Sequence, residues 1–406
     1  MNIAPFRGYR YDLARVGDPS SVVAPPYDQI SPELQATLYA MSPWNIVRTT
    51  LPREGYAAAR AALDAWLAAG VVTREAGPAI YPYTQEYAVG GRVVTRAGFV
   101  ALGEVTEYGA GIVRPHERTH AGPKEDRLRL LEASGADIGL LFMLLDDPTG
   151  AIRAAAAPEG PPLVEARDLR GERHRLWRVT DPAAVGRVQA LMADRSVIIA
   201  DGHHRYETAV AYRRQRPEAR YKLMAFFALD GPGMTIFPNH RLVHDVEGFS
   251  LARLLAGAAR WFEAHPLPAA IRPEPGAIVV VAGREPEGAI LRLRPEAADR
   301  IPWPAGTSAA WRRLAVSVLH EGLLKPFLEI TDAKLEAKSH VDYTADADEA
   351  LALVRKGAYQ AALLIPPTTP DELRAVVAEG EVLPQKSTHF YPKLLDGLVF
   401  YRLGEE

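Results

Sequence analysis

An apolar run, Val197-Ile198-Ile199-Ala200, leads directly into the polar turn Asp201-Gly202-His203-His204-Arg205, and a helical stretch from Tyr206 to Arg214 follows. The apolar run predicts a buried core strand, and a strand that passes through a polar turn straight into a helix is typical of α/β architecture. This succession of elements constrains the fold more than any other stretch of the chain. It also places an unusually polar turn at the start of a helix.

Other stretches predict a similar mixture of elements. Residues 80–89 and 93–105 are predicted as the strands of a hairpin that turns at Gly90-Gly91, and residues 138–145 and 223–229 as buried strands. The apolar spacing of residues 55–69 and 181–193 predicts helices. We therefore predict an α/β or α+β fold. Residues 1–245 form an N-terminal region with the main polar site, and residues 246–406 form a C-terminal α/β region whose final motif, 384–393, is a candidate to return to that site.

The polar turn has the residue types of a phosphate-binding site. A glycine there can adopt positive φ and lets the backbone approach a ligand closely, while the first turn of the helix offers N–H groups and a positive dipole end to an anion. Arg205 can form a bidentate clamp, and His203 and His204 can donate hydrogen bonds or move protons. The alternative is that the histidines cap the helix and pair with acids. We interpret Asp201, Gly202, His203, His204 and Arg205 as a phosphate-binding turn, with Asp201 as a candidate magnesium ligand.

A second polar cluster is His116-Glu117-Arg118-Thr119-His120. Four ionisable groups within five residues are costly to bury unless they pair, so such a cluster suits a cleft. Glu117 is a candidate general base beside His116, and Arg118 a candidate phosphate contact. Two alternatives stay open: a structural ion-pair cluster, and a zinc site, because His116 and His120 match the His-Glu-x-x-His pattern. That pattern works only on a helix, and Gly122-Pro123 follows here at once.

Further polar residues are candidates for the same site. Lys124 and Arg127 follow the second cluster and are candidate phosphate contacts, although a solvated helix start is the common explanation for such a charge run. Asp28, after Pro25-Pro26-Tyr27, is either a turn residue or a carboxylate that faces the site. Two polar groups beside apolar strands are additional candidates to line the pocket: Asn239, His240 and Arg241, and Gln385, Lys386, Ser387 and Thr388.

Composition excludes several classes of function. The 406 residues contain no cysteine, which excludes disulfides, thiolate metal sites and cysteine nucleophiles. A formal net charge of −3 argues against a general nucleic-acid binder. The N-terminus lacks a basic region followed by an apolar run, and the longest apolar runs are too short to cross a bilayer. We therefore expect a cytoplasmic protein whose partner is a small molecule and not a membrane.

Five separated motifs make the chain similar to domain-of-unknown-function family 1015, from its first residues to its last. They are Val23-Ala24-Pro25-Pro26-Tyr27-Asp28, Pro115-His116-Glu117-Arg118-Thr119, Pro123-Lys124-Glu125-Asp126-Arg127, Asp201-Gly202-His203-His204-Arg205-Tyr206-Glu207-Thr208-Ala209 and Pro384-Gln385-Lys386-Ser387-Thr388. This resemblance supplies no activity.

A more distant resemblance is informative about function. The turn at 201–205 resembles the phosphate-binding turn of the ParB and sulfiredoxin-like superfamily, which includes partition proteins that bind CTP and kinases that phosphorylate free serine. In those kinases a similar Gly-His-x-Arg turn holds nucleotide phosphates and an acidic residue activates the serine hydroxyl. The resemblance implies that Gly202, His203, His204 and Arg205 hold phosphate here. No motif match fixes the acid, and Glu117 and Asp28 are candidates from their chemistry alone.

Two features of that superfamily are not evident in this chain. Sulfiredoxin chemistry is excluded because its cysteine is missing. The helix-turn-helix that partition proteins carry after the nucleotide domain has no evident counterpart in the segment after Val246, which is rich in proline and glycine. We therefore expect no DNA-binding region.

The leading hypothesis is an enzyme: a phosphotransferase that uses a nucleotide, ATP or ADP, with Mg²⁺, and phosphorylates a small hydroxylated metabolite, with free serine as the first candidate. A phosphatase that uses the same pocket with water as acceptor fits the residues nearly as well. The alternative from another class is a nucleotide-binding protein that regulates a partner without catalysis. The nucleotide base, the acceptor and the oligomeric state are not determined by the sequence.

Overall fold

The chain folds into two compact units, seen in a computed structural model that describes residues 1–118 and 122–405. Unit 1 comprises Met1–Pro115, Thr119–Thr235 and Pro392–Glu406, and unit 2 comprises His116–Arg118 and Ile236–Tyr391. The division after Thr235 falls inside strand β13 (Thr235–Phe237), ten residues before the boundary that the sequence analysis places at residue 245. The last residues of the chain return to unit 1.

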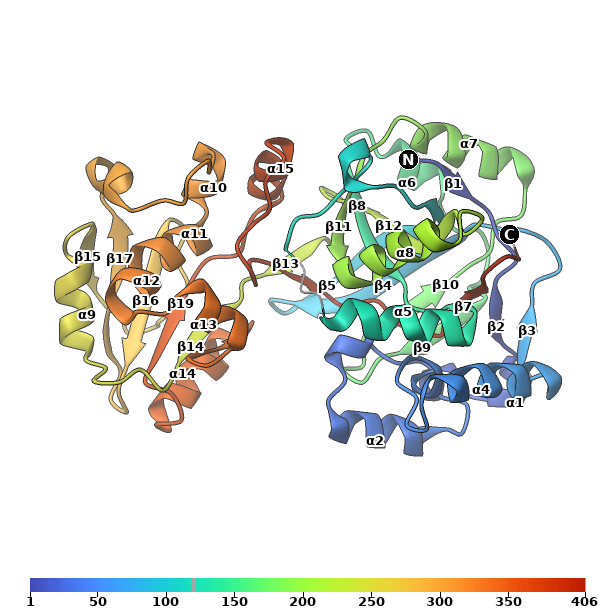
Figure 1. The fold of residues 1–406 in the computed structure, drawn as a ribbon, viewed down its shortest axis with the longest axis horizontal. Helices are drawn as coiled ribbons and strands as arrows, with labels where there is room; N and C mark the ends of the chain where they lie inside the picture. The colour runs from blue at the N-terminus through green and yellow to red at the C-terminus, as the bar shows by residue number, and fades with distance from the viewer. Residues whose placement is uncertain (119–121, 406) are drawn as a thin grey trace. The chain divides into compact units, whose positions relative to one another are not determined.

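A nine-stranded mixed sheet forms the centre of unit 1 (Figure 1). The strand order is β6-β11-β8-β12-β5-β4-β10-β9, and β1 also pairs with β5. The pairs β6–β11 and β8–β12 are parallel and the others are antiparallel. The bounds are β1 (Ile3–Ala4), β4 (Tyr81–Val89), β5 (Arg92–Glu104), β6 (Val113–Arg114), β8 (Leu141–Leu145), β9 (Val164–Arg167), β10 (Arg173–Leu176), β11 (Val197–Asp201) and β12 (Tyr221–Ala228). Two short ladders, β2 (Tyr9–Tyr11) with β3 (Val72–Arg74) and β7 (Ala136–Asp137) with β21 (Tyr401–Arg402), complete the strands of this unit.

The helices of unit 1 are α1 (Leu13–Val16), α2 (Pro32–Met41), α3 (Val47–Thr50), α4 (Tyr56–Ala68), α5 (Gly122–Ser134), α6 (Ala151–Ala155), α7 (Pro182–Met192) and α8 (His203–Gln215). Side-chain caps fix where two of them begin. Ser31 accepts a hydrogen bond from the backbone N–H of Leu34 at the start of α2, and Asp181 caps α7. Helices α5 and α8 pack side by side over the large sheet (Figure 1).

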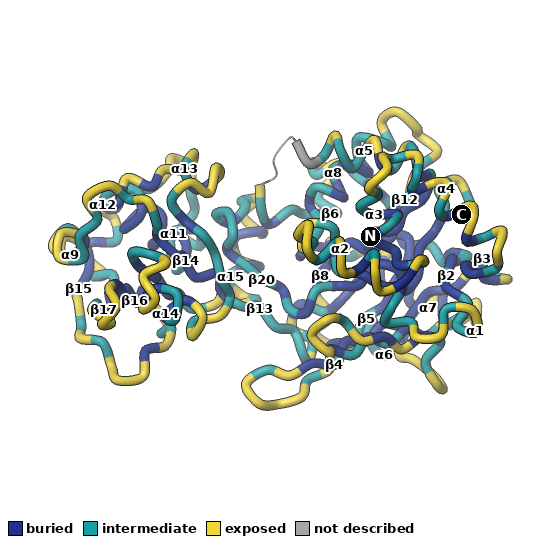
Figure 2. The backbone as a smooth tube through the Cα atoms, turned by 90° about the horizontal axis from the view of Figure 1, so that it is seen from below, coloured by how far each residue is buried: buried dark blue, intermediate teal, exposed yellow. Residues whose placement is uncertain are grey.

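The two faces of the large sheet are chemically different. Alternate residues of a strand point to opposite faces, so Phe99 and Phe226 join an apolar core that also contains Val188 of α7. Arg96, three residues before Phe99 on the same strand, therefore belongs to the other face, where it is fully buried. Figure 2 shows these strands as mostly buried and the tip of the β4–β5 hairpin as exposed.

A six-stranded antiparallel sheet forms the centre of unit 2, in the order β15-β17-β16-β19-β14-β18. The bounds are β14 (His240–Val243), β15 (Phe262–Pro266), β16 (Ala277–Ala282), β17 (Glu287–Leu293), β18 (Val341–Thr344) and β19 (Ala361–Leu364), and a separate ladder pairs β13 with β20 (His389–Tyr391). The helices are α9 (Leu251–Ala258), α10 (Ala309–Arg313), α11 (Ala315–Leu319), α12 (Lys325–Leu328), α13 (Asp332–Ala337), α14 (Ala347–Arg355) and α15 (Pro370–Ala378). Leu351 and Val354 of α14 pack on Val279 of the sheet.

The predicted mixed α/β fold is confirmed in both units, and α4, α7 and the β4–β5 hairpin lie within one residue of their predicted bounds. The strand predicted for residues 138–145 is shorter, because it begins only at Leu141. Backbone groups just before it bond to side chains instead: the Leu140 N–H donates to Asp396 and its carbonyl accepts from Arg205. Among the described residues, no helix has the length and apolarity needed to cross a membrane.

Candidate functional site

The polar turn predicted from the sequence joins β11 to α8 in unit 1. β11 ends at Asp201, and α8 begins at His203, three residues earlier than predicted. Gly202 precedes the helix with φ of 98° and, being glycine, supplies no side-chain cap of its own. A Cβ atom at Gly202 would lie 2.6 Å from Leu141 Cδ2, so both backbone conformation and packing require glycine. The N-terminus of a helix favours an anion through its first-turn N–H groups and its dipole.

Arg205 and Asp201 form an ion pair across this turn. Arg205 Nη2 donates to Asp201 Oδ2 at 3.0 Å, and Nη1 donates to the Leu140 carbonyl. The Arg205 side chain is 8% exposed, so its guanidinium is largely engaged with the protein. The structure therefore gives Arg205 a role in shaping the turn, beside the phosphate contact that the sequence predicts.

Lys393 and Asp28 extend the group of charges. Lys393 Nζ lies 3.4 Å from Asp201 Oδ1, and Arg205 bonds to the other carboxylate oxygen, Oδ2. Burial alone would raise the pKa of Asp201, but the charges of Lys393 and Arg205 outweigh it and lower that pKa to about 2. Asp28, on the short 3₁₀ helix η2 (Tyr27–Gln29), is exposed by surface area. Desolvation by the surrounding protein raises the pKa of Asp28, and the nearby Asp201 carboxylate raises it further. The pKa values of these two neighbouring carboxylates are therefore shifted in opposite directions.

Lys124 and Arg127 lie on α5, which packs against α8. The Lys124 ammonium pairs with Glu207 of α8. Arg127 donates to the Thr50 carbonyl at 2.7 Å, and its guanidinium lies 4.2 Å from the centre of the Tyr27 ring. Both predicted residues therefore belong to unit 1, and the stacking brings Arg127 next to the residue that precedes Asp28.

A small cavity of ≈70 Å³ adjoins this group of charges. Arg205, Lys222, Asp137 and Asp396 line it together with hydroxyl side chains that include Thr50. Lys222 is buried and pairs with Asp137. Burial raises the pKa of Asp396 to about 7, although Arg205 opposes that shift. The cavity thus has charged groups of both signs on its wall.

The described residues of the second predicted cluster, His116–Arg118, belong to unit 2 and are not helical. The Glu117 backbone forms a parallel β-bridge with Leu383, and its Oε1 accepts the Lys386 N–H at 3.0 Å. His116 Nε2 lies 2.9 Å from Thr388 Oγ1, while Arg118 is exposed. A zinc site of the His-Glu-x-x-His type needs a helix, so the conformation of His116 and Glu117 argues against that alternative. His120, its other histidine, lies outside the described residues, and among the described ones no group of three or more metal-ligating side chains occurs.

The two additional groups of predicted residues meet the same segment of unit 2. Asn239 Nδ2 donates to the carbonyls of Lys386 and Thr388 at 3.3 and 3.1 Å. Arg241, fully buried, donates to the carbonyls of Asn239 and Gln385 and lies 3.0 Å from His320 Nε2.

Two more predicted residues of this group are buried. His240 accepts the Ile365 N–H, and the Ser387 hydroxyl donates to the Pro384 carbonyl. Lys386 itself has φ of 57°, a strained backbone for a residue other than glycine.

The predicted residues therefore fall into two sets. Unit 1 holds Asp28, Lys124, Arg127, Asp201, Gly202, His203, His204 and Arg205, and unit 2 holds His116, Glu117, Arg118, Asn239, His240, Arg241, Gln385, Lys386, Ser387 and Thr388. The common cleft predicted for both sets stays a prediction. Sequence reasoning named neither Lys393 nor Asp396 as a site residue. Lys393 ends the motif 384–393 that was a candidate to return to the site, whereas Asp396 stands outside every motif. The return of the chain to unit 1 brings Lys393 next to Asp201 and Asp396 near Arg205.

Residues 3–317 match the model of a protein family described as "Protein of unknown function (DUF1015)". The chain belongs to this family. Among curated proteins none matches it. The family assignment agrees with the five motifs, although the last of them, at 384–388, lies beyond the matched residues.

Several solved structures are similar to this member of the family. A conserved hypothetical protein from Pyrococcus furiosus is 18% identical, with 73% of this chain and 93% of that chain covered and a TM-score of 0.37. A free serine kinase in complex with AMP is 15% identical, with 72% and 86% covered and a TM-score of 0.37. SbnI with a C-terminal truncation, from Staphylococcus aureus, is 11% identical, with 73% and 85% covered and a TM-score of 0.38.

Proposed function

We propose that this protein is a phosphotransferase that moves a phosphoryl group from ATP or ADP to a small hydroxylated metabolite, with free serine as the first candidate. The observation that supports this best is a pair of carboxylates with opposite pKa shifts beside the N-terminus of α8, which begins after Gly202. Asp201 has a pKa of about 2 and the pKa of Asp28 is raised. Neighbouring acids whose pKa values are pushed apart are typical of sites that move protons.

The phosphate groups of the nucleotide would bind at the start of α8. The positive φ of Gly202 turns the backbone there, and the helix dipole favours negative charge at its first turn. His203, His204, Lys124 and Arg127 are the further contacts that we propose, all of them in unit 1. Positioned cations around the phosphates are the main requirement of phosphoryl transfer.

Asp28 is the carboxylate that we propose as the general base. In the reaction, the acceptor hydroxyl oxygen bonds to the terminal phosphorus, the bond to the leaving nucleotide breaks, and the hydroxyl proton passes to the base. Asp28 is exposed, so substrate can reach it, and its raised pKa brings it closer to neutrality than an ordinary carboxylate. Glu117, the other candidate, already accepts a backbone N–H in unit 2.

Mg²⁺ is the cofactor that we propose with the nucleotide. Hard cations prefer carboxylate oxygens, and Asp201 at the start of α8 is the carboxylate that we propose to contact it. Mg²⁺ commonly takes only one or two protein carboxylates and completes its shell with phosphate oxygens and water, so a larger protein cluster is not required. The ≈70 Å³ cavity beside Arg205 suits a small acceptor with charged groups of its own.

Nucleotide binding and turnover test the proposal separately. We expect ATP or ADP with Mg²⁺ to raise the melting temperature of the protein, because a ligand that binds only the folded state stabilises it. We then expect incubation with serine to yield phosphoserine, measured by mass spectrometry, in a panel that includes other hydroxyl metabolites. Release of inorganic phosphate without an acceptor would identify a phosphatase, and binding without any turnover would identify a regulatory protein. Absence of nucleotide binding would contradict the proposal altogether.

A further inference from the structure

Lys393 reaches the phosphate turn from the last segment of the chain. Its ammonium lies 3.4 Å from Asp201 Oδ1, while Arg205 Nη2 donates to Oδ2 of the same carboxylate at 3.0 Å. An ammonium has three N–H donors, and Asp201 is its one hydrogen-bonding partner within the part of the chain that the structure describes. The side chain is 19% exposed, so its remaining donors are accessible to a ligand at the start of α8.

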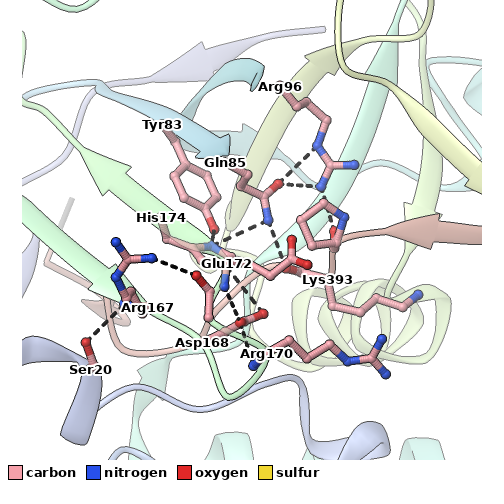
Figure 3. A network of polar contacts seen from close by, with 12 residues as sticks. Ser20, Tyr83, Gln85, Arg96, Arg167, Asp168, Arg170, Glu172, His174 and Lys393 are labelled. Atoms are coloured by element: carbon pink, nitrogen blue, oxygen red, sulfur yellow. Dashed lines mark hydrogen bonds and ion pairs between the residues drawn. The ribbon is translucent and has the colours of Figure 1, made fainter. Parts of the chain in front are cut away.

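Two buried side chains hold the backbone from which Lys393 extends. Gln85 Nε2 donates to the Lys393 carbonyl at 2.9 Å, and Arg96 Nη2 donates to the Pro392 carbonyl at 2.6 Å (Figure 3). The Arg96 guanidinium lies over the rings of Phe142 and Phe227, 4.5 and 5.0 Å from their centres. Consecutive carbonyls of the last segment are therefore fixed to the face of the large sheet.

The support beneath Lys393 is itself fixed by the register of three strands. Gln85 of β4 lies directly opposite Arg96 of β5 and opposite His174 of β10. Its Oε1 accepts hydrogen bonds from Arg96, at 3.0 Å from Nε. On the other side, Tyr83 and His174 form a buried contact of 2.7 Å between the hydroxyl and Nδ1 (Figure 3).

The burial of Gln85 and Arg96 indicates why they hold the backbone at Lys393. Arg96 and Gln85 are 1% and 0% exposed, and burial lowers the pKa of the Arg96 guanidinium to about 10, which reflects the desolvation of its charge. A lysine that only paired with a surface acid would need no such support, because flexible lysines form such pairs unaided. Rigid positioning of a cation by a buried second layer is typical of binding and catalytic sites.

We propose that Lys393 contacts the nucleotide phosphates at the phosphate turn, and that Gln85 and Arg96 are positioning residues which hold its backbone in place. This inference rests on the proposed function and adds a residue to its site. In the free protein Asp201 orients the Lys393 ammonium. A bound phosphate accepts hydrogen bonds from the N–H donors of Lys393 that do not bond to Asp201.

Lys393→Met tests the contact, because methionine keeps the length of the chain and removes the charge. Binding of ATP and of inorganic pyrophosphate is measured by calorimetry. We expect both to bind roughly 10- to 100-fold more weakly, the range for loss of a charge-assisted hydrogen bond. Lys393→Arg should recover part of the affinity, and Lys356→Met, at an exposed lysine of unit 2, should bind like the wild type.

The outcomes separate this inference from the proposed function. If the wild type binds neither ATP nor pyrophosphate, the proposed function fails. If the wild type binds them and Lys393→Met binds equally well, Lys393 makes no phosphate contact and only the inference is overturned.

A spectroscopic readout tests the positioning role without relying on affinity. Reductive methylation with ¹³C labels lysine amines while keeping their charge, and the Lys393 signal is assigned by its loss in Lys393→Arg. We expect pyrophosphate to shift this signal in the wild type and to leave the Lys356 signal in place. Gln85→Glu keeps the acceptor for Arg96 but loses the donor to the Lys393 carbonyl, so the shift should need more pyrophosphate. An unshifted Lys393 signal at saturating pyrophosphate would overturn the contact, and an unchanged titration in Gln85→Glu would overturn the positioning role.

Discussion

The polar clusters of the two units look alike in the sequence and differ in what their charges do. In unit 1, Arg205 and Lys393 share one carboxylate, and a second carboxylate, Asp28, is exposed beside it. In unit 2, Arg241 is fully buried and donates to backbone carbonyls, while Glu117 accepts a backbone N–H. The charges of Asp28 and Lys393 in unit 1 remain accessible to a ligand, whereas the charged side chains of the unit 2 cluster form hydrogen bonds that hold chain segments together. Density of polar residues alone therefore does not distinguish a binding site from internal support.

The largest expected effect separates the two candidate bases. Asp28→Asn should lower turnover by about 10²–10⁴-fold with little change in nucleotide affinity, because it removes the proton acceptor and keeps the shape. Glu117→Gln, the matched change in unit 2, should keep most of the activity and lower the melting temperature slightly. Steady-state kinetics and calorimetry measure both. The reverse result, with Glu117→Gln inactive and Asp28→Asn active, would break the comparison.

Arg241→Met should be the most destabilising of the changes in unit 2. It leaves the carbonyls of Asn239 and Gln385 without their donor inside the protein, at a cost of about 3 kcal/mol in the free energy of unfolding. Urea denaturation measures this cost, and Arg313→Met, at an exposed arginine, should change it by less than about 0.5 kcal/mol. A variant at Arg241 that stays stable yet loses nucleotide binding would make the cluster of unit 2 a ligand site.

Gly202→Ala should affect both stability and phosphate binding in unit 1. The φ of 98° and the predicted contact of the new Cβ with Leu141 should cost about 1–3 kcal/mol. Gly186→Ala in α7 is the control, since a Cβ there meets no neighbour within 4 Å and alanine favours the helix by about 0.5–1 kcal/mol. Denaturation and pyrophosphate calorimetry measure the two effects. Unchanged pyrophosphate affinity in folded Gly202→Ala would argue against phosphate binding at this turn.

The smallest expected effect is a pH dependence from Asp396. Its pKa of about 7 in the folded protein lies above the value of about 3.9 for the unfolded chain. Below pH ~4 both states hold the proton, and from there to pH ~7 the unfolded chain releases it first, so stability falls as pH rises through this window. Asp396→Asn mimics the protonated form and should be more stable than the wild type by roughly 1–2 kcal/mol at pH 8 but not at pH 4. A variant that is less stable at pH 8 would show that the Asp396 carboxylate is ionised and stabilised by Arg205.

Local patterns predicted the elements of the fold well. Gly90-Gly91 predicted the hairpin turn, Asp181 the start of a helix and the run from Val197 a core strand, because each signal lies within a few residues of its effect. The strand expected from residue 138 was too long, because its first backbone groups bond to Arg205 and Asp396, which are distant in the sequence.

The site was predictable only in part, for the same physical reason. The turn at 201–205 is local, and its glycine has the positive φ that the sequence suggested. The motif that ends at Lys393 was a candidate to return to the site, but the contact of Lys393 with Asp201 was not predictable. Its position depends on Gln85 and Arg96, roughly three hundred residues earlier in the chain. The role of Arg241 was not evident either, because burial of a charge among carbonyls leaves no local pattern.

The return of the last segment to unit 1 has a consequence for how the protein is made. Phe400 and Tyr401 are buried in this unit, and Tyr9 bonds to Phe400 across nearly the whole chain. A ribosome releases the chain from its N-terminus, so the β7–β21 ladder and the bridge of Tyr9 with Phe400 can form only after unit 2 has been synthesised. Contacts at such sequence separation close slowly, because their loop entropy is lost before they form. The part of unit 1 that Phe400 and Tyr401 cover is therefore completed only after unit 2 has been synthesised.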